Sequence, residues 1–337
     1  MMPKPRSRLS DVPQPVIQRG NNGDPRILVN SAKKFAKRKL RLLLMPLVRM
    51  AVRYTAPGRL RSQLWRRITA RFFQSVDYPF VARMQSGALI AGNTRDLIQR
   101  FIYFFGVWEP NLTRFLERRL KSGDVFVDVG ANIGYFCLQA SRLVGDTGKV
   151  IAFEASPKVY AYLLENLRRN VADNVDARNL AVSDRQGMVK VFLGHDTNIG
   201  ETSTLPVAGF AYECEIQAES LSMLVAADLL KKVRVIKVDV EGAEWDVVQG
   251  MRGLLAAADE RVEIVIEIIP QRLRTMNRDS QDIVDIFSEF GFYPYRLEHD
   301  YNPQSYVTGA SSRPMRIRAP IETKTDVVFS KIDADLL

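Results

Sequence analysis

From residue 125 onward, the sequence alternates short apolar runs with amphipathic stretches of helical periodicity. The apolar runs have the length of single strands. Strands that alternate with helices form right-handed βαβ units, which build a mostly parallel sheet with helices on both faces. We therefore predict an α/β fold, with strands expected at 125–129, 150–153, 176–182, 188–193, 233–238, 263–268, 293–297 and 327–330.

The first expected strand runs into the segment Asp-Val-Gly-Ala-Asn-Ile-Gly at 128–134 and then into a helix. Gly130 permits a tight turn and a close approach of ligand to backbone, and the helix beyond offers free N–H groups. The Gly-x-x-x-Gly spacing differs from the Gly-x-Gly-x-x-Gly of dinucleotide sites. Asp128 would repel a pyrophosphate and suits a ligand with a positive amino group. The segment therefore favours S-adenosylmethionine over NAD.

Two further carboxylates follow expected strands. Glu154 ends the second strand, where a carboxylate can accept hydrogen bonds from ribose hydroxyls, and Asp239 ends the strand at 233–238, shortly before Glu241. Ligands of an open parallel sheet bind beyond the carboxyl ends of its strands, so Asp128, Glu154 and Asp239 are expected to converge on one crevice. The alternative for Glu154 and Glu241 is that they are acidic residues favoured in the first turn of a helix.

Four segments in this order resemble the FkbM family of S-adenosylmethionine-dependent methyltransferases. They are Asp-Val-Gly-Ala-Asn-Ile-Gly-Tyr at 128–135, Phe-Glu-Ala-Ser-Pro at 153–157, Asn-Leu-Ala-Val-Ser-Asp at 179–184 and Lys-Val-Asp-Val-Glu-Gly-Ala-Glu at 237–244. The resemblance covers about 94–330, and Gly-Val-Trp-Glu-Pro at 106–110 is similar to the segment that precedes the motifs there. It implies a Rossmann-like class I methyltransferase fold with an antiparallel strand near the C-terminus.

The resemblance also implies O-methylation, often of hydroxyls on sugars or polyketide-type natural products, with S-adenosyl-L-methionine as cofactor. It assigns the methionine portion of that cofactor to Asp128, Gly130, Asn132 and Gly134. It assigns the ribose to Glu154, and the flanks of the adenine to Ala181 or Val182.

A hydroxyl is a poor nucleophile at neutral pH and needs a group that accepts its proton. Asp239 or Glu241 is the expected base, and His195, in the Gly/Thr/Ser/Glu-rich stretch 194–222, is a further candidate for base or for covering the site. We expect no metal ligands. A divalent cation on Asp239, Glu241 and Glu267 is the less favoured alternative, and zinc is disfavoured because the two histidines and two cysteines form no ligand motif.

The N-terminal part of the chain differs in composition from the rest. Residues 1–71 contain 18 basic and 2 acidic residues, whereas the remainder contains 30 basic and 36 acidic ones. We predict a disordered tail at 1–30, a basic helical extension at 31–93 and the methyltransferase domain at 94–337. Leu40, Leu43, Leu44, Leu47 and Ala51 share one helical face. This face suits either packing on the body or peripheral association of 31–71 with an anionic membrane.

The expected function is therefore O-methylation of a sugar, glycolipid or natural product, with a small-molecule or glycan acceptor. The alternatives are a non-catalytic nucleotide-binding or regulatory module, and a nucleic-acid methyltransferase recruited by the basic arm. The latter is disfavoured because Asp-Val-Glu-Gly stands after the strand at 233–238, where amino-methylating DNA enzymes carry Asn/Asp-Pro-Pro-aromatic. Two cysteines exclude a disulfide framework. We expect a cytoplasmic protein, with a peripheral position on the inner face of a membrane as the alternative.

Overall fold

The computed structural model describes residues 25–73, 76–194, 200, 202–298, 303–309 and 312–337. The chain forms two compact units, Met1–Leu43 and Leu44–Leu337. Helix α1 (Pro25–Tyr54) begins in the first unit, and its last turns belong to the second. The helix starts at Pro25 rather than at residue 31, so the predicted disordered tail is wrong for 25–30. A proline suits the first helical turn, because its φ is already fixed near the helical value and its missing N–H is not needed there. Residues 1–24 of that tail lie outside the described residues.

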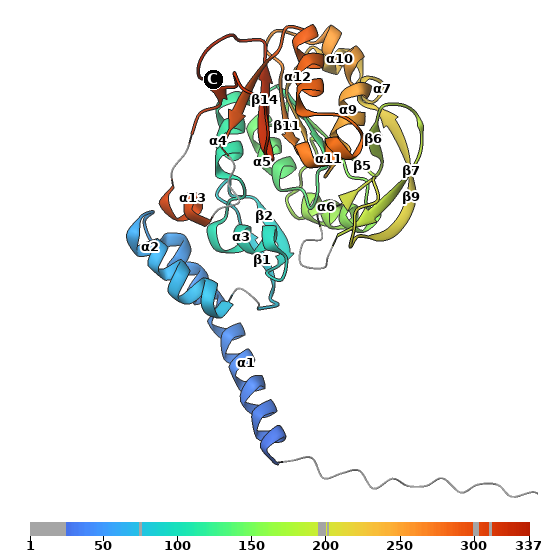
Figure 1. Ribbon diagram of the computed structural model, residues 1–337. Helices are drawn as coiled ribbons and strands as arrows, with labels where there is room; N and C mark the ends of the chain where they lie inside the picture. Colours follow the sequence, from blue (N-terminus) through green and yellow to red (C-terminus); the bar gives the residue numbers. More distant parts are fainter. Residues whose placement is uncertain (1–24, 74–75, 195–199, 201, 299–302, 310–311) are drawn as a thin grey trace, which may run out of the picture. The chain divides into compact units, whose positions relative to one another are not determined.

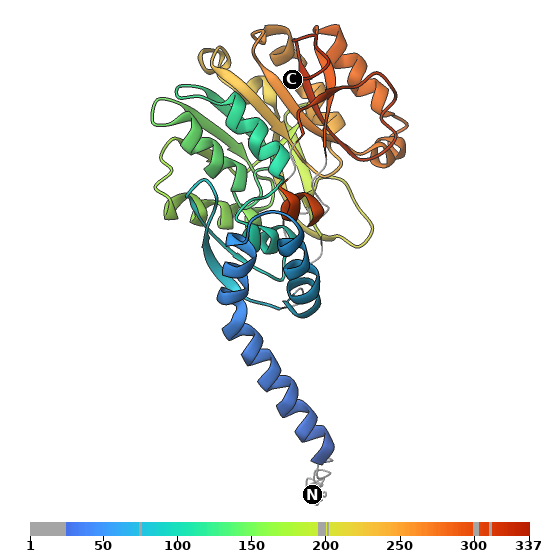
Figure 2. The same cartoon turned by 90° about the vertical axis from the view of Figure 1, so that its left-hand side faces the viewer.

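The second unit begins with helices and a hairpin. Helix α2 (Arg59–Leu64) continues as the π-helix η1 (Trp65–Phe73), and strands β1 (Pro79–Arg83) and β2 (Leu89–Asn93) pair antiparallel. The predicted helical extension is wrong for 79–93, because exposed and buried residues alternate along β1 with the period of a strand. The backbone N–H of Leu89 donates to Asn170 Oδ1 (2.7 Å), and that of Ala91 to Asn166 Oδ1 (2.8 Å). The hairpin thereby docks beside helix α6 (Pro157–Arg169), as both views show (Figures 1 and 2).

The main sheet has eight strands in the order β13-β12-β14-β11-β10-β3-β4-β5. The five strands from β11 to β5 run parallel, and β14 is antiparallel to both of its neighbours. This order confirms the predicted Rossmann-like fold with an antiparallel strand near the C-terminus. The strands are β3 (Val125–Val129), β4 (Lys149–Phe153), β5 (Val175–Arg178), β10 (Val233–Val238), β11 (Glu263–Ile268), β12 (Tyr293–Leu297), β13 (Met315–Arg316) and β14 (Thr325–Ser330).

A second sheet of four strands has the order β6-β9-β7-β8. Its strands are β6 (Ala181–Ser183), β7 (Gly187–Leu193), β8 (Thr202–Ser203) and β9 (Ala211–Ser220). The Gly/Thr/Ser/Glu-rich stretch 194–222, in which no strand was expected, thus contains a ten-residue strand. The expected strand 176–182 is divided between the two sheets as β5 and β6.

Helices lie on both faces of the main sheet (Figure 1). Every residue of β3, β11 and β14 is buried. Within the described part of the chain, no helix combines the length and apolarity needed to cross a bilayer. The remaining helices are α3 (Leu97–Phe105), α4 (Pro110–Arg119), α5 (Tyr135–Val144), α7 (Leu221–Leu224), α8 (Ala227–Leu230), α9 (Glu244–Gly250), α10 (Arg252–Ala257), α11 (Pro270–Thr275), α12 (Ser280–Glu289) and α13 (Pro303–Thr308).

Phe287 packs α12 against β14 of the main sheet. Its ring is fully buried, stacks on Phe329 at 3.8 Å between centroids and meets Phe292 edge-on. We expect Phe287→Ala to lower the free energy of unfolding by about 3–5 kcal/mol, because it leaves a cavity that packed neighbours cannot fill. Urea denaturation measures this. The half-exposed Tyr162 is the control, and Tyr162→Ala should cost about 1 kcal/mol or less. Equal losses for both variants would contradict the assigned packing.

Candidate active site

Two adjoining cavities open at the carboxyl ends of β3, β4 and β10. The first has about 410 Å³ of empty space, part of it open to solvent, and apolar Leu180, Ala181 and Val182 form part of its wall. The second has about 600 Å³ of such space and extends to Trp108 and Tyr135. Both are lined by Gly130, Glu154, Thr202 and Asp239. A ligand that spans both therefore passes the ends of three neighbouring strands.

The turn after β3 requires glycine. Gly130 has φ +82°, and a Cβ there would lie 1.9 Å from the carbonyl oxygen of Asp239. This close approach brings the turn after β3 against the residue that follows β10. Gly134 also has a left-handed φ and caps helix α5, but it lines neither cavity.

Glu154 joins two loops through its carboxylate. The backbone N–H of Asn132 donates to Glu154 Oε2 (2.8 Å), and that of Ser156 donates to Oε1 (3.0 Å). Burial raises the pKa of Glu154 to about 7, although these two hydrogen bonds oppose the shift. A carboxylate accepts up to about four hydrogen bonds, so Glu154 keeps acceptor capacity toward a ligand in either cavity.

Asp128 is buried and lines neither cavity. The thiol of Cys137 donates to Asp128 Oδ2 (3.1 Å), and Lys237 Nζ lies 3.8 Å from Oδ1. Lys237 Nζ also lies 3.1 Å from Asp239 Oδ2. Burial lowers the pKa of Lys237, but the carboxylates of Asp239 and Asp128 outweigh this effect and hold the ammonium charged. Asp128 therefore acts on the site through Lys237, which does line the second cavity.

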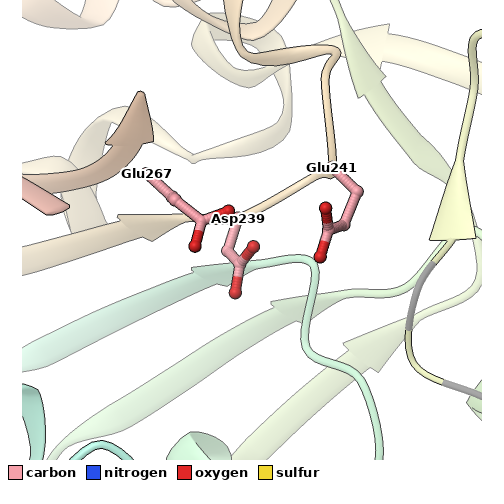
Figure 3. Close-up of side chains that lie close together, drawn as sticks. All are labelled: Asp239, Glu241 and Glu267. Atoms are coloured by element: carbon pink, nitrogen blue, oxygen red, sulfur yellow. The ribbon is translucent and has the colours of Figure 1, made fainter. Parts of the chain in front are cut away.

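Asp239, Glu241 and Glu267 point toward one another, with one oxygen of each lying within 4.8 Å of the others (Figure 3). Each carboxylate also has a cation near it: Lys237 for Asp239, Arg272 Nη2 at 3.2 Å for Glu241, and Lys324 Nζ at 2.7 Å for Glu267. These three cations already offset the charge of the cluster. A divalent cation on these residues stays the less favoured alternative, and nothing in the structure tests it.

Glu109 is a candidate that the sequence reasoning missed. Its side chain is 5% exposed, and the residue lines the second cavity together with Asp239 and Lys237. Burial, and then the nearby carboxylates of Asp326 and Asp239, raise the pKa of Glu109 well above its usual range. In sequence, Glu109 is marked only by its place directly before Pro110, the first residue of α4. A carboxylate at that position is ordinarily interpreted as a helix cap. The side chain of Glu109 makes no cap hydrogen bond.

Backbone strain concentrates around the second cavity. Among the described residues, five non-glycine residues have a left-handed φ, and Glu109, Asn132 and Glu241 are three of them. All three line this cavity. Such a conformation costs about 1–2 kcal/mol per residue, less for asparagine, and strain of this kind typically clusters at functional sites.

The structure thus brings together most of the residues predicted for the site. Gly130, Asn132, Glu154, Ala181, Val182, Asp239 and Glu241 line one or both cavities. Asp128 and Gly134 stand behind the lining. His195 lies outside the described residues.

Comparison with known proteins places these motifs in a family. Residues 128–294 match the model of the methyltransferase FkbM domain. The hexuronic acid methyltransferase AglP of Haloferax volcanii is 28% identical over 182 residues, covering 54% of this chain and 68% of that protein. The 31-O-demethyl-FK506 methyltransferase FkbM of Streptomyces tacrolimicus is 31% identical over 163 residues, covering 39% of this chain and 61% of that protein.

A solved O-methyltransferase of Thermotoga maritima aligns with a TM-score of 0.38 at 15% identity, covering 74% of this chain and 76% of that one. The chain spans between 26% and 68% of the length of the curated relatives that it matches. The fold is therefore assigned from the order and direction of the strands in the main sheet.

Gly130→Ala tests the close approach of the turn to Asp239. A Cβ would meet the Asp239 carbonyl oxygen and would also be held at a left-handed φ, so we expect a loss of about 2–4 kcal/mol in the free energy of unfolding. Urea denaturation measures it. Gly187→Ala is the matched control, since a Cβ there meets nothing within 4 Å. Equal midpoints for the two variants would contradict the geometry of the turn.

The raised pKa of Glu154 predicts a pH dependence of stability. Its pKa moves from 4.5 to about 7 on folding, so between these values the Glu154 carboxyl is protonated to a greater extent in the folded chain than in the unfolded chain. This contribution is complete below the lower value and is lost as the pH rises through the upper one. Glu154→Gln removes this contribution. The free energy of unfolding of the variant should therefore fall less steeply with rising pH than that of the unmodified chain, and the two slopes should differ by up to about 1.4 kcal/mol per pH unit. Urea titrations across the window measure both slopes, and identical slopes would refute the assignment.

Proposed function

Because this chain belongs, through residues 128–294, to the FkbM family of methyltransferases, we propose that it binds S-adenosyl-L-methionine across the two cavities. We further propose that it methylates a hydroxyl of a sugar, glycolipid or other natural product. The proposal rests chiefly on one observation, the concentration of carboxyl groups in the lining of the second cavity. Four carboxylic residues and one ammonium are among its described lining residues, namely Glu109, Glu154, Asp239, Glu241 and Lys237.

This lining fits the cofactor. S-adenosyl-L-methionine carries a sulfonium and an amino group, both positive, and a cavity rich in carboxylates favours such a ligand. A pyrophosphate, by contrast, would be repelled. A bound cation would also favour the ionised forms of Glu109 and Glu154, whose pKa values are raised.

The first cavity fits the adenosine. Leu180, Ala181 and Val182 offer apolar contact to a flat base, and Glu154, which also lines this cavity, can accept hydrogen bonds from ribose hydroxyls. Gly130 and Asn132 would contact the methionine portion. In this proposal Asp128 and Gly134 do not touch the cofactor; Asp128 positions Lys237, and Gly134 supports the start of α5.

When bound, the cofactor supplies an electrophilic methyl group. The chain's own residues must align the acceptor hydroxyl, exclude water and take its proton. Asp239 and Glu241 are partly exposed in the second cavity and are the proposed proton acceptors. Glu109 is a third candidate, because its raised pKa makes its carboxylate a stronger base once it is ionised.

The names of two relatives support a sugar acid or an O-demethylated natural product as the class of acceptor. One is described as a hexuronic acid methyltransferase, and the other acts on 31-O-demethyl-FK506. We therefore propose that a polyhydroxylated small molecule or glycan enters the second cavity.

Calorimetry with S-adenosylhomocysteine tests cofactor binding. Glu154→Ala should weaken binding by about 10- to 100-fold, since hydrogen bonds between a carboxylate and the ribose are worth about 1.5–3 kcal/mol. Glu165→Ala, on the exposed face of α6, is the matched control and should bind like the unmodified chain. Equal affinity in Glu154→Ala would contradict the site.

Release of S-adenosylhomocysteine in a panel of hexuronic acid glycosides, glycolipids, macrolides and tRNA tests the reaction. The double variant Asp239→Asn, Glu241→Gln is expected to keep cofactor binding and lose turnover. Cofactor binding by the unmodified chain without turnover on any acceptor would support a regulatory module. Turnover on tRNA alone would support a nucleic-acid enzyme.

A further inference from the structure

An apolar stripe is exposed on the last turns of α1, within the second unit. Leu44, Leu47, Met50 and Tyr54 are 37%, 62%, 55% and 77% exposed. They recur at intervals of three or four residues, so they share one side of the helix. We refer to these four residues as the outer stripe.

The other side of the same turns packs on the body. Met45 and Val52 are fully buried, and the guanidinium of Arg49 donates to the carbonyl oxygen of Tyr103 (2.8 Å). Packing on the body therefore accounts for the apolar residues on one side of the helix but not for those of the outer stripe. Single exposed apolar residues are ordinary on a protein surface, but contiguous ones mark an interaction site.

The outer stripe lies in a strongly basic stretch of the sequence, and this charge indicates what it binds. Between Asp24 and Asp77 the sequence has fourteen basic residues and no acidic one. In the second unit, Arg59, Arg66 and Arg67 of this stretch are exposed. The first unit, taken by itself, has the same character, because its described Lys37, Lys39, Leu40 and Leu43 are exposed.

We propose that the outer stripe docks the protein onto an anionic lipid bilayer. An apolar helix face within a basic stretch buries its apolar side chains at the boundary between headgroups and acyl chains, while lysines and arginines meet the lipid phosphates. Tyr54 has the apolar ring and polar tip typical of this boundary. A second copy of the chain is a poorer occupant, because pairing would bring together two basic stretches that contain no acidic residue.

This inference goes beyond the proposed methyl transfer and does not depend on it. Co-sedimentation of the full chain with two kinds of vesicle tests it. Vesicles of phosphatidylcholine with one quarter phosphatidylglycerol should bind the chain at least tenfold more strongly than pure phosphatidylcholine vesicles, and added salt should weaken this binding. Leu47→Ser with Met50→Ser should reduce binding to the anionic vesicles by at least tenfold.

The matched control is Leu164→Ser with Met223→Ser, which removes one exposed leucine and one exposed methionine elsewhere on the same unit. It should bind like the unmodified chain, and equal thermal midpoints would establish that both double variants are folded. Absence of binding to anionic vesicles, equal binding to both vesicle types, or equal loss in both double variants would overturn the proposal. Self-association that depends on the outer stripe, measured by light scattering, would assign it to a second copy instead.

Discussion

The buried ammonium of Lys237 holds the candidate site together. It lies between Asp128 on β3 and Asp239 after β10, and it reaches the second cavity from the centre of the sheet. Without it, two carboxylates at adjacent strand ends would face each other, one of them fully buried. Removing one partner of such a buried pair typically costs about 3–5 kcal/mol, because it leaves an uncompensated charge. The arrangement of carboxylates at the strand ends therefore depends on the ammonium of Lys237, a buried residue of β10.

The wall of the second cavity, near Lys237 and Asp239, contains several residues with a strained backbone. Glu109, Asn132 and Glu241 each adopt a left-handed backbone, and Gly130 lies so close to Asp239 that a side chain there is excluded. The strain and the carboxylates occur together because both follow from three loops meeting over the ends of parallel strands. The buried core around β3, β11 and β14 provides the stability that tolerates it.

Local sequence motifs predicted the alternating core of the fold and most of the cavity lining, because a strand, a turn and a helix N-terminus are encoded within a few residues. Features that depend on distant pairs were missed. In sequence, Lys237 is only a basic residue within an apolar strand. Its role is recognisable only from the folded structure, in which its ammonium lies beside Asp128. Strands β1 and β2 have only five residues each, so their alternation is brief, and β9 has only Ile216 and Ala218 as buried residues among polar ones. Glu109 could not be recognised because its neighbours Asp239 and Asp326 come from other strands and loops.

The four-stranded sheet has its own hydrogen-bonded ladder, separate from that of the main sheet, yet β8 contributes Thr202 to both cavities and Ser203 to the first. The lengths of β7 and β9, and the loops between them, can thus change while the register of the parallel strands is preserved. Such an arrangement lets evolution diversify one wall of a pocket while the opposite wall stays constant.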